Sequence, residues 1–408
     1  MVKENDSIIQ NRKFYQRNKI LNIIRFHKDV SRFEIKKLTF YSMTTVISVI
    51  DELISQGYIY EEESEENRVG RKPIWIRINP EGGYFIGVEF NGRMMHCNML
   101  DFSGSVTYRH KTIMNQEDDP SDIVTKIIHN VDKARATLGE KRDKLLGIGV
   151  GVPGYINKVE GIAKKYTHFR KWKDVPIKAM LEEKLDVPCY IENNVNVMAF
   201  AYKWFYYHGE CEDFLFLSIR TGARIVPVVN NHLVFSETGF SGEIGHAKIT
   251  TQHDICSCGK FGCLNAEISD FAIASRIREG IRIGRFAEIY NMVKGDLEAI
   301  TVSTFVESVL LRHEDSIMLM KKIAYHLGSA LGFTVNLFAP KKIIIFGELA
   351  KIGSLFIDEV RKNIEYVVIS ENIEGFSVQA SNEGEDLGAT GAAALVMQKQ
   401  FHFIEQII

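Results

Sequence analysis

The segment GEIGHAKITTQHDICSCGKFGC, residues 242–263, gathers one candidate imidazole ligand and three thiols in a short stretch. This is the donor set of a tetrahedral structural zinc site, and thiolates select soft or borderline metals. The predicted ligands are His246, Cys256, Cys258 and Cys263. His253 is a rival nitrogen donor, which we rank second because it lies only three residues before Cys256. A chance cluster of reduced core cysteines is the alternative interpretation.

The chain around this segment alternates short apolar strands with helices, a pattern typical of α/β proteins. Residues 84–100 predict two strands joined by a turn at Asn91-Gly92, and residues 214–229 repeat this strand-hairpin opening. The repeat predicts two related lobes with a ligand-binding cleft between them. The predicted boundaries are 81–200 for the first lobe, which also takes in the C-terminal helix 387–408, and 201–386 for the second lobe.

The first 80 residues differ in charge and pattern from the rest of the chain. Residues 1–40 carry ten Lys and Arg against four acidic residues, a local charge of +6, whereas the whole chain has a net charge of −2. Apolar spacing predicts a helix around residues 20–26, a second helix opened by a capping box at Ser31, and a third helix capped by Ser42. We therefore expect a separate basic domain over residues 1–80.

The predicted third helix and the hairpin after it suit double-stranded DNA. Residues 58–60 and 74–78 alternate like two strands, and three helices followed by a hairpin are typical of a winged helix-turn-helix. The predicted DNA contacts are Ser42, Met43, Thr44, Thr45 and Ser48 on the helix and Arg68, Arg71 and Lys72 at the hairpin tip. The tip cations suit phosphates and a narrow A·T-rich minor groove, whereas the helix itself lacks Arg and Lys. A dimerisation or docking domain is the alternative.

Length and composition narrow the class of protein. The chain has 408 residues, 45% of them hydrophobic and 25% charged, with a mean hydropathy of −0.08, so it can form two or three domains. No apolar run reaches the roughly 18 residues of a membrane helix, and the polar N-terminus does not resemble a signal peptide. Six cysteines are too few for a disulfide scaffold. We expect a cytoplasmic protein with no membrane partner.

GEIGH at 242–246 and CSCGKFGC at 256–263 resemble the signature of the ROK family, which unites repressors and sugar kinases of the actin-like, ribonuclease-H-like fold. The N-terminal winged helix with RVGRKP at 68–73 resembles the repressor branch. The resemblance implies a two-lobed α/β body behind the winged helix and a structural Zn²⁺ on the ligands named above. It also implies a monosaccharide between the lobes, near Asn193, Asn194, Glu243 and His246.

The sequence departs from the kinases of that family where phosphate and catalysis are concerned. The family's two phosphate-binding motifs are both altered in this chain. D-x-G-G-T is replaced by Glu89 to Arg93, and G-T-G-x-G is replaced by Arg220 to Arg224. Arg93, Arg220 and Arg224 could still attract an anion. The family motif E-N-D-x-N supplies a catalytic Asp, whereas this chain has Asn194. An amide cannot accept the proton of a sugar hydroxyl, and such assistance is worth on the order of 10² to 10⁴ in rate. We therefore predict no kinase activity and no catalytic residue.

The sugar site also departs from the family pattern. After GCL the family has Glu, whereas this chain has Asn265, with Glu267 on a different face. Glu243 is either a sugar ligand or a support for the metal loop that orients His246. If His246 binds metal through one nitrogen and a sugar hydroxyl through the other, the ligand and the metal loop are coupled.

The predicted function is a DNA-binding transcriptional regulator, a repressor of carbohydrate-utilisation genes that responds to a sugar. We expect a homodimer or homotetramer that binds an inverted-repeat, A·T-rich operator. Two alternatives stay open at this point. One is a sugar kinase with a DNA-binding head, and the other is a constitutive DNA-binding or partner-docking protein whose sugar site has decayed.

Overall fold

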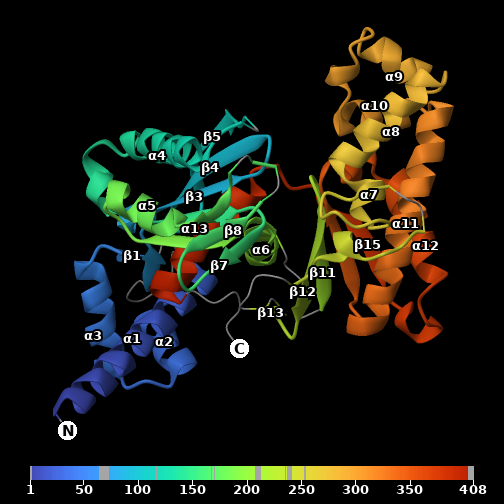
Figure 1. Ribbon diagram of the computed structural model, residues 1–408. Helices are drawn as coiled ribbons and strands as arrows, with labels where there is room; N and C mark the ends of the chain where they lie inside the picture. Colours follow the sequence, from blue (N-terminus) through green and yellow to red (C-terminus); the bar gives the residue numbers. More distant parts are fainter. Residues whose placement is uncertain are drawn as a thin grey trace.

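The computed structural model describes residues 2–63, 73–115, 117–166, 168–169, 171–206, 213–234, 236, 241–251 and 254–402. The predicted tip contacts Arg68, Arg71 and Lys72 and the rival ligand His253 lie outside the described residues. Figure 1 shows a helical N-terminal part beside a first lobe, and a second lobe on the other side of a narrow connection. No helix among the described residues is long and apolar enough to cross a bilayer.

The N-terminal part, called the head below, has the three helices and the hairpin that the sequence predicts. Its elements are α1 Val2–His27, α2 Arg32–Thr39, α3 Met43–Ser55, β1 Ile59–Glu63 and β2 Ile74–Ile78. The capping box opens α2 as expected, because the Ser31 and Glu34 side chains each accept from the other residue's backbone N–H. The strands pair antiparallel, with Ile59 opposite Ile78. The helix α1 is much longer than the apolar pattern at residues 20–26 indicated.

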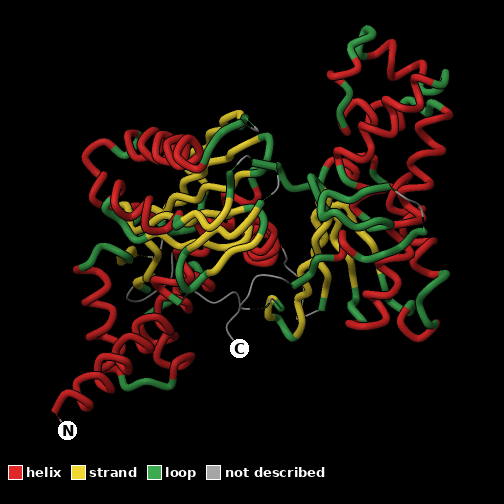
Figure 2. Tube along the Cα trace, viewed as in Figure 1, coloured by secondary structure: helices red, strands yellow, loops and turns green. Residues whose placement is uncertain are grey.

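The first lobe is a five-stranded sheet in the order β10-β6-β3-β4-β5 with helices on both faces (Figure 2). Its main elements are β3 Tyr84–Phe90, β4 Met94–Asp101, β5 Val106–Ile113, β6 Leu145–Val152, β10 Cys189–Asn193, α4 Pro120–Ala136, α5 Ile177–Leu185, α6 Asn194–Ala201 and α13 Leu387–Phe401. A smaller sheet joins β7 Tyr155–Asn157, β8 Ile162–Lys165 and β9 Lys173–Val175. The glycines at 87 and 149 bring the sheet close to α13, because a Cβ there would lie within 2 Å of carbonyl oxygens of that helix.

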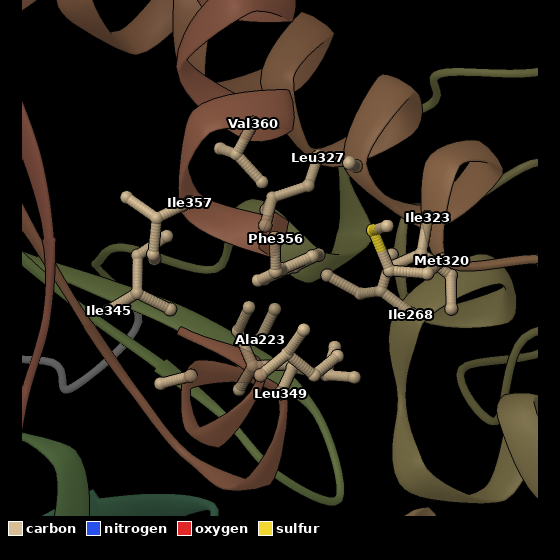
Figure 3. Close-up of a cluster of buried hydrophobic side chains, with 14 of the residues drawn as sticks. Ala223, Ile268, Met320, Ile323, Leu327, Ile345, Leu349, Phe356, Ile357 and Val360 are labelled. Carbon is tan, nitrogen blue, oxygen red and sulfur yellow. The ribbon is translucent and has the colours of Figure 1, made fainter. Parts of the chain in front are cut away.

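The second lobe repeats the plan with a five-stranded sheet in the order β13-β12-β11-β14-β15. Its strands are β11 Phe214–Ile219, β12 Ala223–Val229, β13 His232–Leu233, β14 Lys342–Phe346 and β15 Ser377–Ala380. Its helices are α7 Asn265–Ile268, α8 Asp270–Arg282, α9 Ala287–Met292, α10 Val302–Leu310, α11 Glu314–Phe338 and α12 Ser354–Glu365. Ile345 from the sheet packs with Leu327 and Phe356 from the helices, and these side chains are fully buried (Figure 3).

The head shares a hydrophobic core with the first lobe. Ile20 and Ile24 of α1 belong to the same buried cluster as Phe85 of β3 and Phe401 of α13. The Asn22 side chain donates to the His402 carbonyl at 3.2 Å. The guanidinium of Arg25 lies 4.5 Å from the ring centre of Trp204, which follows α6 in a short π-helix, Tyr202–Tyr206. The head is therefore packed directly against the helices that hold the first lobe's half of the cleft.

Candidate functional site

The four predicted metal ligands come together in the second lobe. The GEIGH segment ends in a 3-10 turn, Ile244–His246, and the loop from Cys256 to Cys263 folds beside it. The His246 Nδ1 atom lies 3.6 Å from Cys256 Sγ, and the sulfurs of Cys258 and Cys263 are 3.8 Å apart. A tetrahedron with metal–sulfur bonds of about 2.3 Å has edges of about 3.8 Å. All four donor atoms lie within 4.8 Å of one another, so the cluster fits one metal ion.

Glycines let the metal loop take this shape. Gly259 has φ +83° and Gly262 has φ +74°, a conformation that side-chain-bearing residues rarely adopt. A Cβ at Gly262 would also lie 2.1 Å from the Thr250 carbonyl oxygen. The Cys256 N–H donates to the Lys260 carbonyl at 2.9 Å and closes the turn. The loop is therefore folded by its own backbone into a position where the three sulfurs face His246.

The free side of His246 faces an acidic side chain. Its Nε2 atom is 4.0 Å from Glu243 Oε2, while Glu243 Oε1 is 3.6 Å from the Arg224 guanidinium. Burial raises the pKa of Glu243, and the positive charges of Arg224 and His246 oppose that rise. Burial lowers the pKa of Arg224, which the carboxylates of Glu243 and Glu192 oppose. Glu192 lies in β10 of the first lobe, one residue before the end of the strand, so its charge reaches Arg224 of the second lobe across the gap between the lobes.

Asn193 and Asn194 are buried at the start of α6 and already have partners. The Asn193 side-chain oxygen accepts from the N–H groups of Val195 and Asn196, and its amide donates to the Gly154 carbonyl at 2.9 Å. It is thus the N-cap of α6. The Asn194 amide donates to Glu89 Oε1 at 3.1 Å. The first lobe's predicted sugar residues are therefore held by the fold itself, with the Asn194 amide turned toward Glu89 of β3.

Asn265 has a structural role that the sequence did not indicate. Its side-chain oxygen accepts from the Ala223 N–H at 2.8 Å, which ties α7 to the second hairpin. A Cβ at Gly245 would lie 2.2 Å from the same oxygen, so the metal segment packs directly on it. Glu267 is fully buried and pairs with Arg276 at 2.8 Å. It faces α8 and α11, on a different face from Asn265, as predicted.

The two altered phosphate loops are tied to carboxylates of the opposite lobe. Arg220, in the β11–β12 turn, lies 2.9 Å from Glu89 of β3, and the Glu89 side chain is fully buried. Arg93, after β3, lies 3.6 Å from Asp270 at the start of α8. The hydroxyls of Tyr166 and Thr221 are 3.1 Å apart and also join the lobes. The sequence analysis predicted that these arginines could attract an anion. In the fold, each of them is paired with an acidic side chain.

A cavity of about 510 Å³ lies beside these ties, between the lobes. Both hairpins contribute to its wall through Arg93 and Arg220. The same wall carries four carboxylates, Asp270, Glu348, Glu383 and Glu385. Burial raises the pKa of Asp270, and the positive charges of Arg93 and Arg220 oppose that rise. The wall holds four carboxylates against three Lys and Arg side chains, Arg93, Arg220 and Lys351, so its charge does not favour a polyphosphate.

The predicted DNA contacts on α3 form one accessible edge of the head. Ser42 is the N-cap, and its hydroxyl accepts from the Thr45 N–H at 3.1 Å. Thr44 and Ser48 are exposed, Met43 and Thr45 are half-buried, and the opposite side of α3 is buried. The sequence reading missed Ile47, which is 40% exposed on the accessible side. The structure leaves these side chains open to a partner.

Comparison with known proteins places this geometry among related chains. The model of the ROK family matches residues 85–399. A xylose repressor of Caldicellulosiruptor bescii is 28% identical over 386 residues, which cover 95% of this chain and 96% of that protein. A crystal structure of a ROK family transcriptional regulator, a homolog of the E. coli MLC protein, shares the fold with a TM-score of 0.82 at 20% identity, covering 96% of this chain and 98% of that one.

A second solved structure shows where the head stands apart. A ROK family glucokinase from Streptomyces griseus, in complex with glucose and AMPPNP, has a TM-score of 0.69 at 22% identity. The match covers all of that chain but only 78% of this one. The two-lobed body is thus shared with a kinase, whereas the full length of this chain is shared with a regulator.

Proposed function

This chain belongs to the ROK family, and we propose that it is a DNA-binding transcriptional repressor of carbohydrate-utilisation genes that responds to a sugar. The observation that carries the proposal is the union of a winged helix-turn-helix head with a kinase-like body whose phosphate loops are occupied by interlobe ion pairs. Similarity to a xylose repressor over 95% of the chain supports the same function.

The head supplies the proposed DNA contacts. An exposed N-terminal edge on α3 suits the major groove, where hydroxyl and apolar side chains read base edges directly or through water. We propose that Ser42, Met43, Thr44, Thr45 and Ser48 make these contacts. The basic side chains of Arg68, Arg71 and Lys72 in the wing would hold phosphates or a narrow A·T-rich minor groove. Affinity is then expected to fall steeply with salt.

The cleft supplies the proposed sugar site. Glu243 and His246 of the second lobe face the end of β10 in the first lobe, where Asn193 and Asn194 begin α6. A sugar that joins these groups would change the closure of the lobes. Because α6 leads into Trp204 and Trp204 packs on Arg25 of α1, a shift of α6 would reach the head. Since one relative is a xylose repressor, xylose is the first sugar to test.

We propose that the metal is a structural Zn²⁺ held by His246, Cys256, Cys258 and Cys263. Zinc would fix the metal loop and bind the Nδ1 atom of His246, which leaves Nε2 for Glu243 or a sugar hydroxyl. The sugar response would then depend on the metal loop. The His246→Ala variant tests this dependence of the sugar response on the metal loop. Unchanged metal content together with an unchanged sugar response in this variant would contradict it.

We propose that kinase activity is lost. Asn194 stands where the family's kinases have a catalytic Asp, and its amide is bound to Glu89. The Arg220 guanidinium holds Glu89 from the other side at 2.9 Å. A nucleotide would have to break this buried pair to bring its phosphates between the hairpins, and breaking such a pair costs several kcal/mol.

We propose that two copies act together, as an inverted repeat with two half-sites requires. Large apolar side chains are exposed along α11 and at the end of α12: Met318, Tyr325, Phe333, Leu337 and Tyr366. A second copy of the chain is the occupant we propose for this surface. Sedimentation of the Phe333→Glu variant is expected to show the monomer, and an unchanged mass would place the interface elsewhere.

Selection of genomic DNA by the purified, zinc-loaded protein tests the proposed function. Fragments are recovered without sugar and with xylose, glucose or a pool of other mono- and disaccharides. We expect a discrete inverted repeat beside transport or catabolic genes, released by one sugar. Failure to enrich any site under every condition would overturn the regulator proposal. Enrichment that no sugar alters would favour a constitutive DNA-binding protein.

A further inference from the structure

The turn between α2 and α3 holds a phenylalanine in a conformation that favours glycine. Phe40 ends α2 with φ 61° and ψ 20°, and its N–H donates to the Lys36 carbonyl at 3.0 Å. A side chain in this left-handed conformation crowds the backbone, which is why helices so often end on glycine. The Phe40 residue is also 91% exposed, so burial does not offset the strain. Phe40 thus combines an unfavourable backbone conformation with an exposed aromatic ring, and neither feature stabilises the fold. Such a residue is a candidate for contact with a binding partner.

The turn is held in place from both sides. The Thr39 hydroxyl donates to the Ile35 carbonyl at 2.7 Å and accepts from the Tyr41 N–H at 3.2 Å. Tyr41 is half-buried, and the Lys19 ammonium lies 5.7 Å from its ring centre. The backbone on each side of Phe40 is therefore anchored. The backbone therefore sets the point from which the exposed ring leaves the head surface.

This ring lies beside the proposed DNA-reading edge. Phe40 precedes Ser42, the N-cap of α3, by two residues, so their Cα atoms are at most about 7 Å apart. Lys36 and Lys37 are exposed in the last turn of α2, and the Lys37 ammonium lies 4.6 Å from the ring centre of Phe33. The surface around Phe40 thus combines exposed lysines of α2 with the start of α3, which has no Lys or Arg of its own.

We propose that Phe40 is a DNA-contact residue whose ring packs against a thymine C5-methyl group in the major groove. This rests on the proposed function, since it assumes that the head binds an operator. Apolar contact with the thymine methyl is a recognised form of direct readout, and phenylalanine is among the side chains that make it. It gives the head a source of base discrimination that does not require Arg or Lys on α3.

The Phe40→Gly variant of the full-length protein separates strain from binding. Glycine relieves the left-handed backbone, so we expect the melting temperature to stay equal or rise by about 2 °C. The affinity for the highest-ranked fragment of the genomic selection is expected to fall about tenfold. Replacement of single thymines in the fragment by deoxyuridine removes only the methyl group. At one position per half-site this replacement should weaken the wild type and leave Phe40→Gly unchanged.

The chain offers a matched control in the first lobe. Asp186 ends α5 with φ 52°, is exposed, and donates its N–H to the Glu182 carbonyl at 3.3 Å, so it shares the cap geometry of Phe40 away from the head. Asp186→Gly should bind DNA as the wild type does. Three outcomes would overturn the proposed Phe40 contact but not the proposed function. They are wild-type DNA affinity in Phe40→Gly, equal sensitivity of both proteins to deoxyuridine, and a changed sedimentation mass of the variant. A wild type that selects no DNA would overturn the proposed function with it.

Discussion

The metal loop and the pair of hairpins differ in what they offer a ligand. At the metal loop, four donor atoms converge within 4.8 Å, and His246 keeps its Nε2 atom toward Glu243. At the hairpins, the cations that would meet phosphate are bound to Glu89 and Asp270 across the lobes. The metal loop brings a candidate donor set together, whereas the hairpin arginines make interlobe contacts. The proposal that this chain senses a ligand and does not transfer phosphate predicts different effects of variants at the two places.

The largest expected effect is at the metal loop. Cys263→Ser removes one of the three sulfurs from the candidate metal cluster. We expect the bound metal to fall from one per chain to near zero and the free energy of unfolding to drop by about 4 kcal/mol or more. Metal analysis and thermal unfolding measure both.

Cys189 provides the control for this prediction. It is buried in the first lobe, where burial raises the pKa of its thiol to about 12, so it should neither bind metal nor react. Cys189→Ala should keep full metal content. Wild-type metal content in Cys263→Ser would mean that the metal is bound without Cys263, and a wild type without metal would mean that the three thiols are a reduced cysteine cluster.

The next effect is at the buried hairpin contact. Arg220→Met leaves the Glu89 carboxylate fully buried without its cation, and breaking such a pair is worth about 3 to 5 kcal/mol. Urea unfolding measures the loss. The double variant Glu89→Gln, Arg220→Met should recover most of it, because the uncompensated charge is gone. A loss below about 1 kcal/mol in Arg220→Met would show that the pair does not join the lobes in solution.

A smaller effect is expected from a carboxylate at position 194. Asn194→Asp replaces an amide donor by a second carboxylate beside Glu89, so the fold should lose about 2 kcal/mol. It should still not phosphorylate xylose or any common hexose in an ATP-coupled assay, because the hairpin cations remain paired. Asn196→Asp is the matched control, since its amide donates to Glu192 in the same way. Sugar phosphorylation by Asn194→Asp alone would show that the hairpins still admit a nucleotide.

The metal loop and the hairpin contact also differ in how far the sequence predicts them. Cys256, Cys258 and Cys263 lie in one loop, so their spacing alone places them together. The partner of Arg220 is 131 residues away, in another lobe, and the chain holds many acidic residues that could have met it. Only the assembled sheets decide that choice. Local patterns also predicted the caps at Ser31 and Ser42.

Tertiary packing changed other predictions for the same reason. Asn265 looked like a weakened sugar ligand, but its oxygen holds the Ala223 N–H. The helix α1 extends back to Val2, although few apolar residues mark its beginning, and its later turns are buried against α13. Composition identifies the faces that must be buried. It does not identify the partner element when that element lies hundreds of residues away.

The smallest expected effect is at Arg93, whose ion pair has the same charges as that of Arg220 but is more exposed to solvent. Arg93 pairs with Asp270 as Arg220 pairs with Glu89, but the Arg93 side chain is 41% exposed and the ion pair is longer, at 3.6 Å. Solvent screens such a pair, so Arg93→Ala should cost at most about 1 kcal/mol at pH 7. Arg109→Ala, which breaks an exposed pair with Asp386 outside the cleft, is the control.

The direction in which the stability of Arg93→Ala changes with pH tests whether Asp270 is the partner of Arg93. Burial raises the pKa of Asp270, and Arg93 opposes that rise, so the pKa should be higher still in the variant. A carboxyl whose folded-state pKa lies above its unfolded value binds its proton more tightly when folded, so lowering the pH stabilises the fold through this group. The stability gap between Arg93→Ala and the wild type should therefore narrow as the pH falls from 7 toward that pKa. A gap that stays constant on acidification would mean that Arg93 acts through its contact with the Phe271 ring, 5.4 Å away, and not through the carboxylate.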